Sequence, residues 1–124
     1  MRFVITTLLW ALTFGLASAH ELTPTYPKLR QSVYDDVLVT NMSLFNRRQD
    51  VDYYSIEVWD EEWNAVQFAV STKVVQVKYL ERKNIEIFFK ASDRERVTYI
   101  CTRSRILKGE ESSVIASNIC SKVK

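Results

Sequence analysis

The stretch Val51-Asp52-Tyr53-Tyr54-Ser55-Ile56-Glu57-Val58-Trp59 decides the fold class of this chain. Its side chains alternate with a period of two, so that Tyr54, Ile56 and Val58 share one face and Glu57 lies on the other. Alternation over this length, with β-branched and aromatic residues, predicts a β-strand with one buried face. Both faces carry aromatic side chains, which is typical of a strand inside a small sandwich.

Stretches with similar patterns lie on both sides of this strand, and no window supports an amphipathic helix. The further expected strands are residues 22–29, 37–42, 66–70, 74–79, 84–89, 97–106 and 112–123. Pro24 and Pro27 confine the first of these to a sheet edge or to a switch between two sheets. About seven or eight short strands predict an all-β protein, a single immunoglobulin-like antiparallel β-sandwich.

Residues 1–19 precede this domain and have the pattern of a secretory signal peptide. Arg2 supplies the positive charge, residues 3–16 are mostly apolar, and Ala17-Ser18-Ala19 is a small-x-small cleavage site. An uncleaved membrane anchor is the alternative, but the apolar run is short for a span of about 20 residues. We therefore expect a domain of residues 20–124 that is periplasmic or secreted and leaves the membrane once the signal is cleaved.

The inventory of residue types excludes most function classes. A formal net charge of +2 gives no long-range field for nucleic acid. His20 is the one histidine, and Cys101 and Cys120 are the two cysteines, so no zinc site of Cys and His ligands can be completed. A Ser-His-Asp or Cys-His mechanism would have to use His20. We expect no enzyme activity and no cofactor.

The two cysteines predict a hairpin made by the last two strands. Cys101 and Cys120 are symmetric about a midpoint between Glu110 and Glu111, next to Gly109. Residues directly opposed in a hairpin have Cβ atoms about 4.5–5.5 Å apart, which is near disulfide reach. Export would place them where a disulfide persists, and closing this loop contributes roughly 3 kcal/mol in the chain-entropy model. A redox-active pair is the alternative, but there is no C-x-x-C spacing to lower a thiol pKa.

The order of these features resembles the N-terminal domain of PapD-like periplasmic pilus chaperones. The resemblance rests on a proline-containing first strand (22–29), on Val37-Leu38-Val39-Thr40-Asn41, on the Tyr-rich strand ending at Trp59, on Arg94-Glu95-Arg96-Val97-Thr98-Tyr99, and on Val114-Ile115-Ala116-Ser117-Asn118-Ile119. It covers residues 21–124, and one branch of the family links the last two strands by a disulfide. It implies a fold of immunoglobulin type and a last strand that is lent to a pilus subunit.

The resemblance also implies a site for the subunit's C-terminal carboxylate, formed by an arginine on the first strand and a lysine on the last. Tyr26 occupies the arginine position here, and Lys122 falls at or close to the lysine position. A phenol cannot provide a guanidinium fork for a carboxylate. The family's second sandwich domain would begin where this sequence stops.

The last strand is the expected partner-binding element. Period two places Val114, Ala116, Asn118 and Cys120 on one face and Ile115, Ser117, Ile119 and Ser121 on the other. If Cys120 bonds to Cys101, the isoleucines lie on the opposite side, and an exposed edge of this kind suits strand addition. The expected partner-binding residues are Val114, Ile115, Ala116, Ser117, Ile119 and Lys122.

Other candidate sites each have a plainer interpretation. His20, as a mature N-terminus, resembles half of a copper chelate, but a second histidine is missing and a solvated terminus is the better interpretation. Asp60-Glu61-Glu62, with Asp50 and Asp52, suggests calcium but lacks the alternating spacing, so a solvated loop is favoured. Glu61 or Glu62 could be one half of a glycosidase carboxylate pair, but nothing in the sequence identifies the other half.

Two surface features remain as candidates. The basic residues Arg94, Arg96, Arg103, Arg105 and Lys108 suggest a face for an acidic partner, although a solvated face is commoner. The aromatic residues Trp59, Trp63, Tyr53, Tyr54 and Phe68 suggest a sugar platform, although core packing is more common for at least half of them. Asn41-Met42-Ser43 is a glycosylation sequon, which has meaning only in a eukaryotic secretory route.

Two functional hypotheses from different classes follow. The first is a periplasmic chaperone or assembly protein that binds an extended strand of a secreted, pilin-like subunit by edge-strand pairing. The second is a structural or adhesive immunoglobulin-like module that stays in a surface or secreted assembly.

Overall fold

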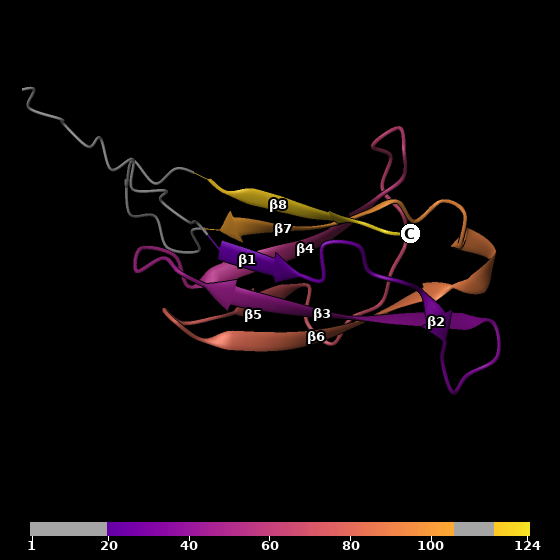
Figure 1. Cartoon of the computed structure of the whole chain (residues 1–124), viewed down its shortest axis with the longest axis horizontal. Coiled ribbons are helices and arrows are strands. Elements are labelled where there is room, and N and C mark those ends of the chain that lie inside the picture. The colour runs from indigo at the N-terminus through magenta and orange to yellow at the C-terminus, as the bar shows by residue number, and fades with distance from the viewer. Residues whose placement is uncertain (1–19, 106–115) are drawn as a thin grey trace, which may run out of the picture.

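The computed structural model describes residues 20–105 and 116–124, which form two antiparallel β-sheets packed face to face (Figure 1). The first sheet contains β1 (His20–Thr23), β2 (Arg30–Gln31), β3 (Val37–Asn46) and β6 (Arg82–Lys90). β3 is its central strand, with β1 and β2 along one side and β6 along the other. The all-β sandwich expected from the sequence is confirmed.

The second sheet has the order β5-β4-β7-β8. Its strands are β5 (Val74–Gln76), β4 (Tyr53–Trp59), β7 (Tyr99–Arg105) and β8 (Asn118–Lys122). A short 3-10 helix, η1 (Ala91–Asp93), connects β6 to β7. No helix within the described ranges is long and apolar enough to cross a membrane. The signal peptide expected at residues 1–19 lies outside the described residues and stays a prediction.

The core lies between the two sheets and is formed by alternate residues of the long strands. In β4, Tyr54, Ile56 and Val58 point inward and are buried, as the alternation of the sequence predicted. The same period places alternate side chains of β3 and β6 in the core. These core residues include Leu38, Met42, Leu44, Ile85, Ile87 and Phe89.

One expected strand is wrong. Residues 66–70 make no strand, because the segment crosses between the sheets instead of running along one of them. Ala65 bridges Trp59 of the second sheet, and Ala69 then bridges Phe88 of the first. Val66 is nevertheless buried, so the apolar pattern reported burial correctly but not pairing.

The first segment of the domain switches between sheets. β1 pairs with the last residues of β3, and β2 pairs with its first residues. Between them, Thr25 and Pro27 accept backbone hydrogen bonds from the end of the chain, next to β8. The switch that the two prolines suggested is therefore present, and it decides how much of β8 remains accessible.

Candidate strand-binding edge

β7 and β8 form the expected hairpin, and the predicted disulfide between Cys101 and Cys120 is present. The two cysteines are directly opposed, with Cα atoms 4.0 Å apart. Ser104 and Val123 donate backbone hydrogen bonds across the hairpin, to Ser117 and Thr98. The odd-numbered residues of β8 therefore direct their backbone groups toward β7, and the even-numbered residues direct theirs outward.

The outward edge of β8 is covered along only part of its length. Lys122 donates its N–H to the Thr25 carbonyl (3.1 Å), and Lys124 donates to the Pro27 carbonyl (3.1 Å). Within the described residues, the outward backbone groups of Asn118 and Cys120 have no backbone partner. In the described part of the chain, the part of the β8 edge that lacks a backbone partner is therefore its first half, and β1 runs close to it.

The side chain of Ile119, the isoleucine of β8, is placed differently from the expectation. Ile119 is half-buried and packs against the core, because the face opposite the disulfide is the inner face of the sheet. Ala116, Asn118 and Lys122 are exposed, and Ser117 is half-buried. Val114 and Ile115 lie outside the described residues. The exposed part of this edge is thus its backbone and small or polar side chains rather than Ile119.

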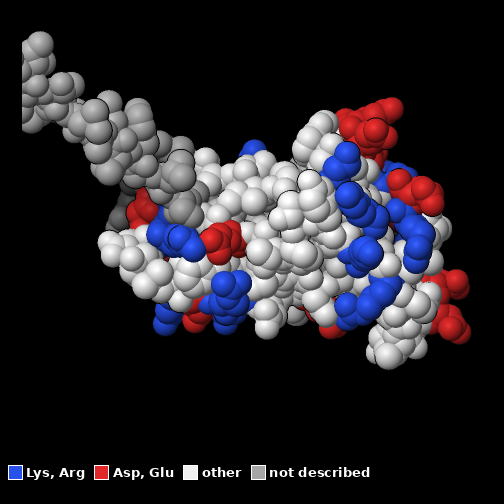
Figure 2. Space-filling view, viewed as in Figure 1, with Lys and Arg blue, Asp and Glu red and all other residues white. Residues whose placement is uncertain are grey.

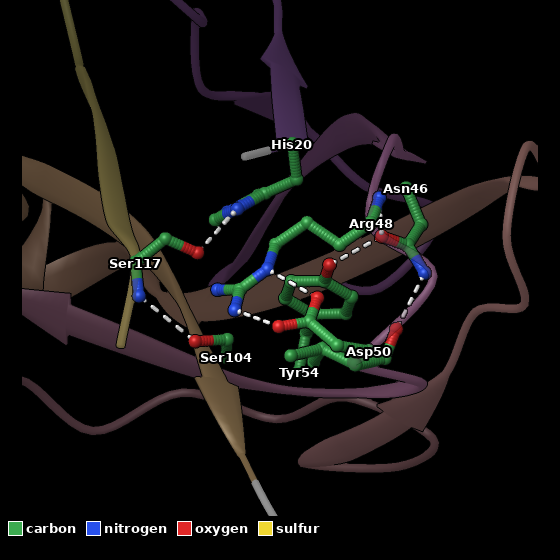
Figure 3. Close-up of polar contacts among 8 residues, drawn as sticks. His20, Asn46, Arg48, Asp50, Tyr54, Ser104 and Ser117 are labelled. Atoms are coloured by element: carbon green, nitrogen blue, oxygen red, sulfur yellow. Dashed lines mark hydrogen bonds and ion pairs between the residues drawn. The ribbon is translucent and has the colours of Figure 1, made fainter. Parts of the chain in front are cut away.

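His20 is not solvated. The sequence favoured a solvated terminus because a second histidine for copper is missing, and the structure corrects that interpretation. It is 3% exposed and lies between the sheets, where its ring contacts Tyr54 at 4.7 Å between centroids. Its Nδ1 atom is hydrogen-bonded to Ser117 Oγ (3.1 Å) (Figure 3). Its Nε2 atom is hydrogen-bonded to Thr102 Oγ1 (2.8 Å). Burial lowers the pKa of His20 to about 4, so the ring is neutral at pH 7.

Next to His20 lies a buried polar cluster centred on Asn46 (Figure 3). The Asn46 amide donates to the carbonyls of Val51 (2.7 Å) and Val77 (2.8 Å), and its Oδ1 accepts from the Tyr54 hydroxyl. Burial raises the pKa of Tyr54 to about 12. Because each of these groups has a partner, the cluster fixes the loops that enter β4 and β6. Reasoning from the sequence missed it; its one signal is an asparagine that ends a strand and is followed by a turn.

Tyr26 and Lys122, the two positions that the resemblance singled out, lie on neighbouring segments. Tyr26 is 54% exposed and follows Thr25, whose carbonyl binds the Lys122 amide. The Lys124 ammonium lies 4.5 Å from the centre of the Tyr26 ring. Lys and Arg side chains gather on this face around the C-terminus (Figure 2). This end of β8 is therefore electropositive, although the arginine is absent.

Some of the other basic and acidic candidates form ion pairs within the chain. Arg105 binds Glu57 (3.2 Å), and Arg96 binds Asp60 (3.8 Å) and Asp93 (3.4 Å). Lys108 lies outside the described residues. Two of the basic candidates, Arg96 and Arg105, are therefore bound to acidic side chains of the same chain.

The acidic loop is held by its own backbone. The Asp60 carboxylate accepts the N–H groups of Glu62 (2.9 Å) and Asn64 (2.8 Å), which lowers the pKa of Asp60. Asp50 is bound to Arg48 at 2.6 Å. In the described part of the chain, no group of three or more His, Cys, Asp or Glu side chains is arranged to hold a metal ion.

The aromatic candidates divide between core and surface. Tyr54 is fully buried, and Tyr53, Trp59 and Phe68 are half-buried. Trp63 is 54% exposed and stacks on Tyr99, with ring centroids 4.3 Å apart. The structure therefore does not bring the five aromatic residues together as one platform.

Comparison with known proteins shows the fold. No family model matches the chain, and no curated protein sequence matches it. Among solved structures, the chain is similar to the E. coli chaperone DraB, with a TM-score of 0.60 and 13% identity over 84% of this chain and 52% of that one. It is similar to the periplasmic chaperone SfaE, with a TM-score of 0.55 and 10% identity over 85% of this chain and 56% of that one.

A third similar structure is the ASH / PapD-like domain 7 of human CEP192, with a TM-score of 0.54 and 12% identity over 99% of this chain and 94% of that domain. The chain spans about half the length of the two chaperones and nearly all of the human domain. At these identities the likeness is one of structure. The chain has the immunoglobulin-like fold of PapD-like domains, which these chaperones share.

Proposed function

We propose that this protein is a chaperone-type or assembly protein that acts outside the cytoplasm and binds an extended strand of a secreted, pilin-like subunit along the first half of β8. The observation that carries the proposal is the outward backbone edge of Asn118 and Cys120, which has no backbone partner among the described residues. An unpaired edge of this kind accepts a strand by main-chain hydrogen bonds. The proposed role is binding, not catalysis.

The surroundings of this edge support strand addition. The disulfide fastens β8 to β7 directly beside the open positions, so a bound strand would meet a fixed template. Thr25 and Pro27 close the second half of the edge, which limits a partner strand to the first half. The disulfide also favours an oxidising compartment, in agreement with the expected export signal.

Lys122 is the proposed contact for a carboxylate of the partner. Its side chain is exposed, and its N–H binds the carbonyl of Thr25, the residue before Tyr26. Lys and Arg side chains gather around the C-terminus, which follows two residues later (Figure 2). A lysine acts as a point charge rather than a two-pronged donor, so without the arginine this contact is weaker than a paired Arg–Lys site.

The test separates the backbone of β8 from its side chains. Asn118→Pro removes an outward N–H and leaves the bonds to β7 intact, whereas Asn118→Ala removes only the side chain. We expect wild type and Asn118→Ala, immobilised with the disulfide formed, to capture the same partner from secreted proteins, and Asn118→Pro to lose it. Hydrogen exchange should show the Asn118 and Cys120 amides protected only in the complex. Equal capture by all three proteins, or unchanged exchange at these amides, would contradict edge pairing.

A structural module without a release step is the second candidate. The match to nearly the whole of PapD-like domain 7 of human CEP192 favours it, because the same fold also occurs as one domain of that human protein. The two candidates differ in turnover. A chaperone exchanges its bound subunit when unlabelled subunit is added, whereas a structural module keeps it through repeated washing.

A further inference from the structure

A second open strand edge lies on the opposite side of the molecule, along β6. Phe88 exchanges both of its backbone hydrogen bonds with Ala69, at 2.9 Å each, so its N–H and C=O point away from β3. Because direction alternates along a strand, Arg82, Asn84 and Glu86 also direct their backbone groups outward. No backbone partner for these residues lies among the described residues. Figure 1 shows β6 at the lower margin of the first sheet.

The open stretch has defined ends. Ala69 closes it at Phe88, and at the other end the chain turns before Arg82, where the Glu81 N–H is donated to the Lys78 carbonyl at 2.9 Å. A groove of about 620 Å³ runs beside the edge, between β6 and β5, and Val70, Val74 and Ile85 contribute to its lining. A strand laid along this edge would lie beside this groove at Asn84, the middle one of the three residues that lack a backbone partner within the described ranges.

The charges of this stretch fit a second copy of the same strand. The side chains of Arg82, Asn84 and Glu86 all lie on the outer face of the sheet and are exposed. In an antiparallel self-pairing centred on Asn84, Arg82 stands opposite Glu86 of the second copy, Asn84 stands opposite Asn84, and Glu86 stands opposite Arg82. Opposite charges directly across a ladder are stabilising.

The hydrogen-bonding pattern selects the same register. A two-fold axis at Asn84 is the arrangement in which every open backbone position of one strand meets an open position of the other. Each of the resulting pairs exchanges both N–H···O bonds. If the axis moved toward Phe88, the second copy would have to pair with the backbone of Phe88, which is already paired with Ala69.

We propose that two copies of this protein associate through their β6 edges, in a two-fold symmetric dimer whose first sheet continues from one copy into the other. The contact is isologous, as is usual for two-fold dimers. Arg82 keeps its present contacts with the Ser43 hydroxyl (3.0 Å) and the Phe45 ring (5.0 Å), because a guanidinium has donors left for a carboxylate. The short ladder predicts weak association.

Sedimentation equilibrium of the purified protein, from about 10 µM to about 1 mM, is the first measurement, since weak dimers form in this range. We expect the average mass to rise toward that of a dimer. Arg82→Glu or Glu86→Arg alone places like charges at both ends of the ladder and should raise the dissociation constant about tenfold or more. The exposed Glu86 side chain forms no hydrogen bond or ion pair with the described residues, so Glu86→Arg guards against a folding defect in Arg82→Glu.

Mixing the two variants is the decisive experiment. In a mixed dimer the glutamates of the Arg82→Glu copy meet the arginines of the Glu86→Arg copy, so the equimolar mixture should regain wild-type affinity. Asn84→Pro, which removes an outward N–H together with the side chain, should abolish the dimer, and Asn84→Ala, which removes the side chain alone, should keep it.

Asn118→Pro is the matched control on the other edge and should leave the dimer unchanged, so this proposal can fail independently of the proposed function. A monomer at every concentration would overturn the inference. So would variants that dimerise as wild type does, or a mixture that stays monomeric.

Discussion

β6 and β8 are both edge strands of this sandwich, and they offer their edges in different ways. β8 is fastened to its neighbour by a disulfide, and half of its outer edge is closed by Thr25 and Pro27. β6 is held by a long ladder to β3, and among the described residues its outer edge is closed only at Phe88. Both strands alternate in the same way along the sequence, so accessibility depends on which segments cross beside them.

The two edges also differ in the kind of partner that fits them. The open positions of β8, Asn118 and Cys120, carry no charges that complement each other in a self-pairing. Those of β6 carry Arg82 and Glu86 on either side of Asn84. β8 therefore suits a different chain, and β6 suits a second copy. The following predictions test how each edge is held in place.

The largest expected effect comes from releasing β8. Cys101→Ser removes the disulfide and should lower the free energy of unfolding by about 2–5 kcal/mol, the usual loss for a small secreted domain. Urea denaturation measured by circular dichroism gives this value, and wild type with dithiothreitol is the control. Hydrogen exchange should rise most in β7 and β8 and least in the β3–β6 ladder. Equal acceleration in both places would show that the two edges are not held independently.

Acid should weaken the contacts between β1 and the start of β8. The pKa of His20 in the folded protein, about 4, lies below its ordinary value of 6.5, so the unfolded chain binds the proton more tightly. The contribution is complete above pH 6.5 and is lost as pH falls toward 4, by up to about 3 kcal/mol.

Urea midpoints measured between pH 7 and 4 test this prediction. In His20→Gln the urea midpoint should depend less steeply on pH in this range. The part of the dependence that comes from carboxylates should be unchanged. A profile for His20→Gln that overlays the wild-type profile would assign the acid sensitivity to other groups.

The smallest expected effect concerns the loop that leads into β6. Tyr54→Phe removes the hydroxyl bound to Asn46 but keeps the ring, and Asn46 Oδ1 retains the Arg48 amide (2.9 Å). We expect a loss of about 1 kcal/mol, the net value of one hydrogen bond. Thermal unfolding measures the loss, with Tyr53→Phe on the half-buried outer face as the matched control. A larger loss in the control would locate the stabilising contact outside the cluster.

Much of the fold could be predicted because the signals that specify it are local. The alternation of Tyr54, Ile56 and Val58 gave the inner face of β4, and the symmetric spacing of the cysteines gave the β7–β8 hairpin. The strand predicted at residues 66–70 was wrong, because a segment that is buried without pairing has the same apolar pattern as a strand.

The candidate sites were less predictable because they depend on contacts between distant segments. His20 lies far from Thr102 and Ser117 in the sequence, and nothing near it indicates burial. Ile119 was expected at an exposed edge, but its face could be assigned only once the disulfide was known to lie on the outer side. Trp63 and Leu80 have positive φ angles, 64° and 60°. Glycine is the usual residue in this conformation, so the sequence does not indicate it at these positions.

By itself, the sequence determined the all-β class, the inner face of β4 and the cysteine pair, because period-two alternation and symmetric spacing act through neighbouring residues. The tertiary structure alone decided that His20 is buried, that Thr25 and Pro27 close half of β8, and that Ala69 leaves the rest of the β6 edge open. The physical reason is that a strand carries the same backbone groups wherever it lies. Whether they are satisfied depends on which remote segment passes within hydrogen-bonding distance.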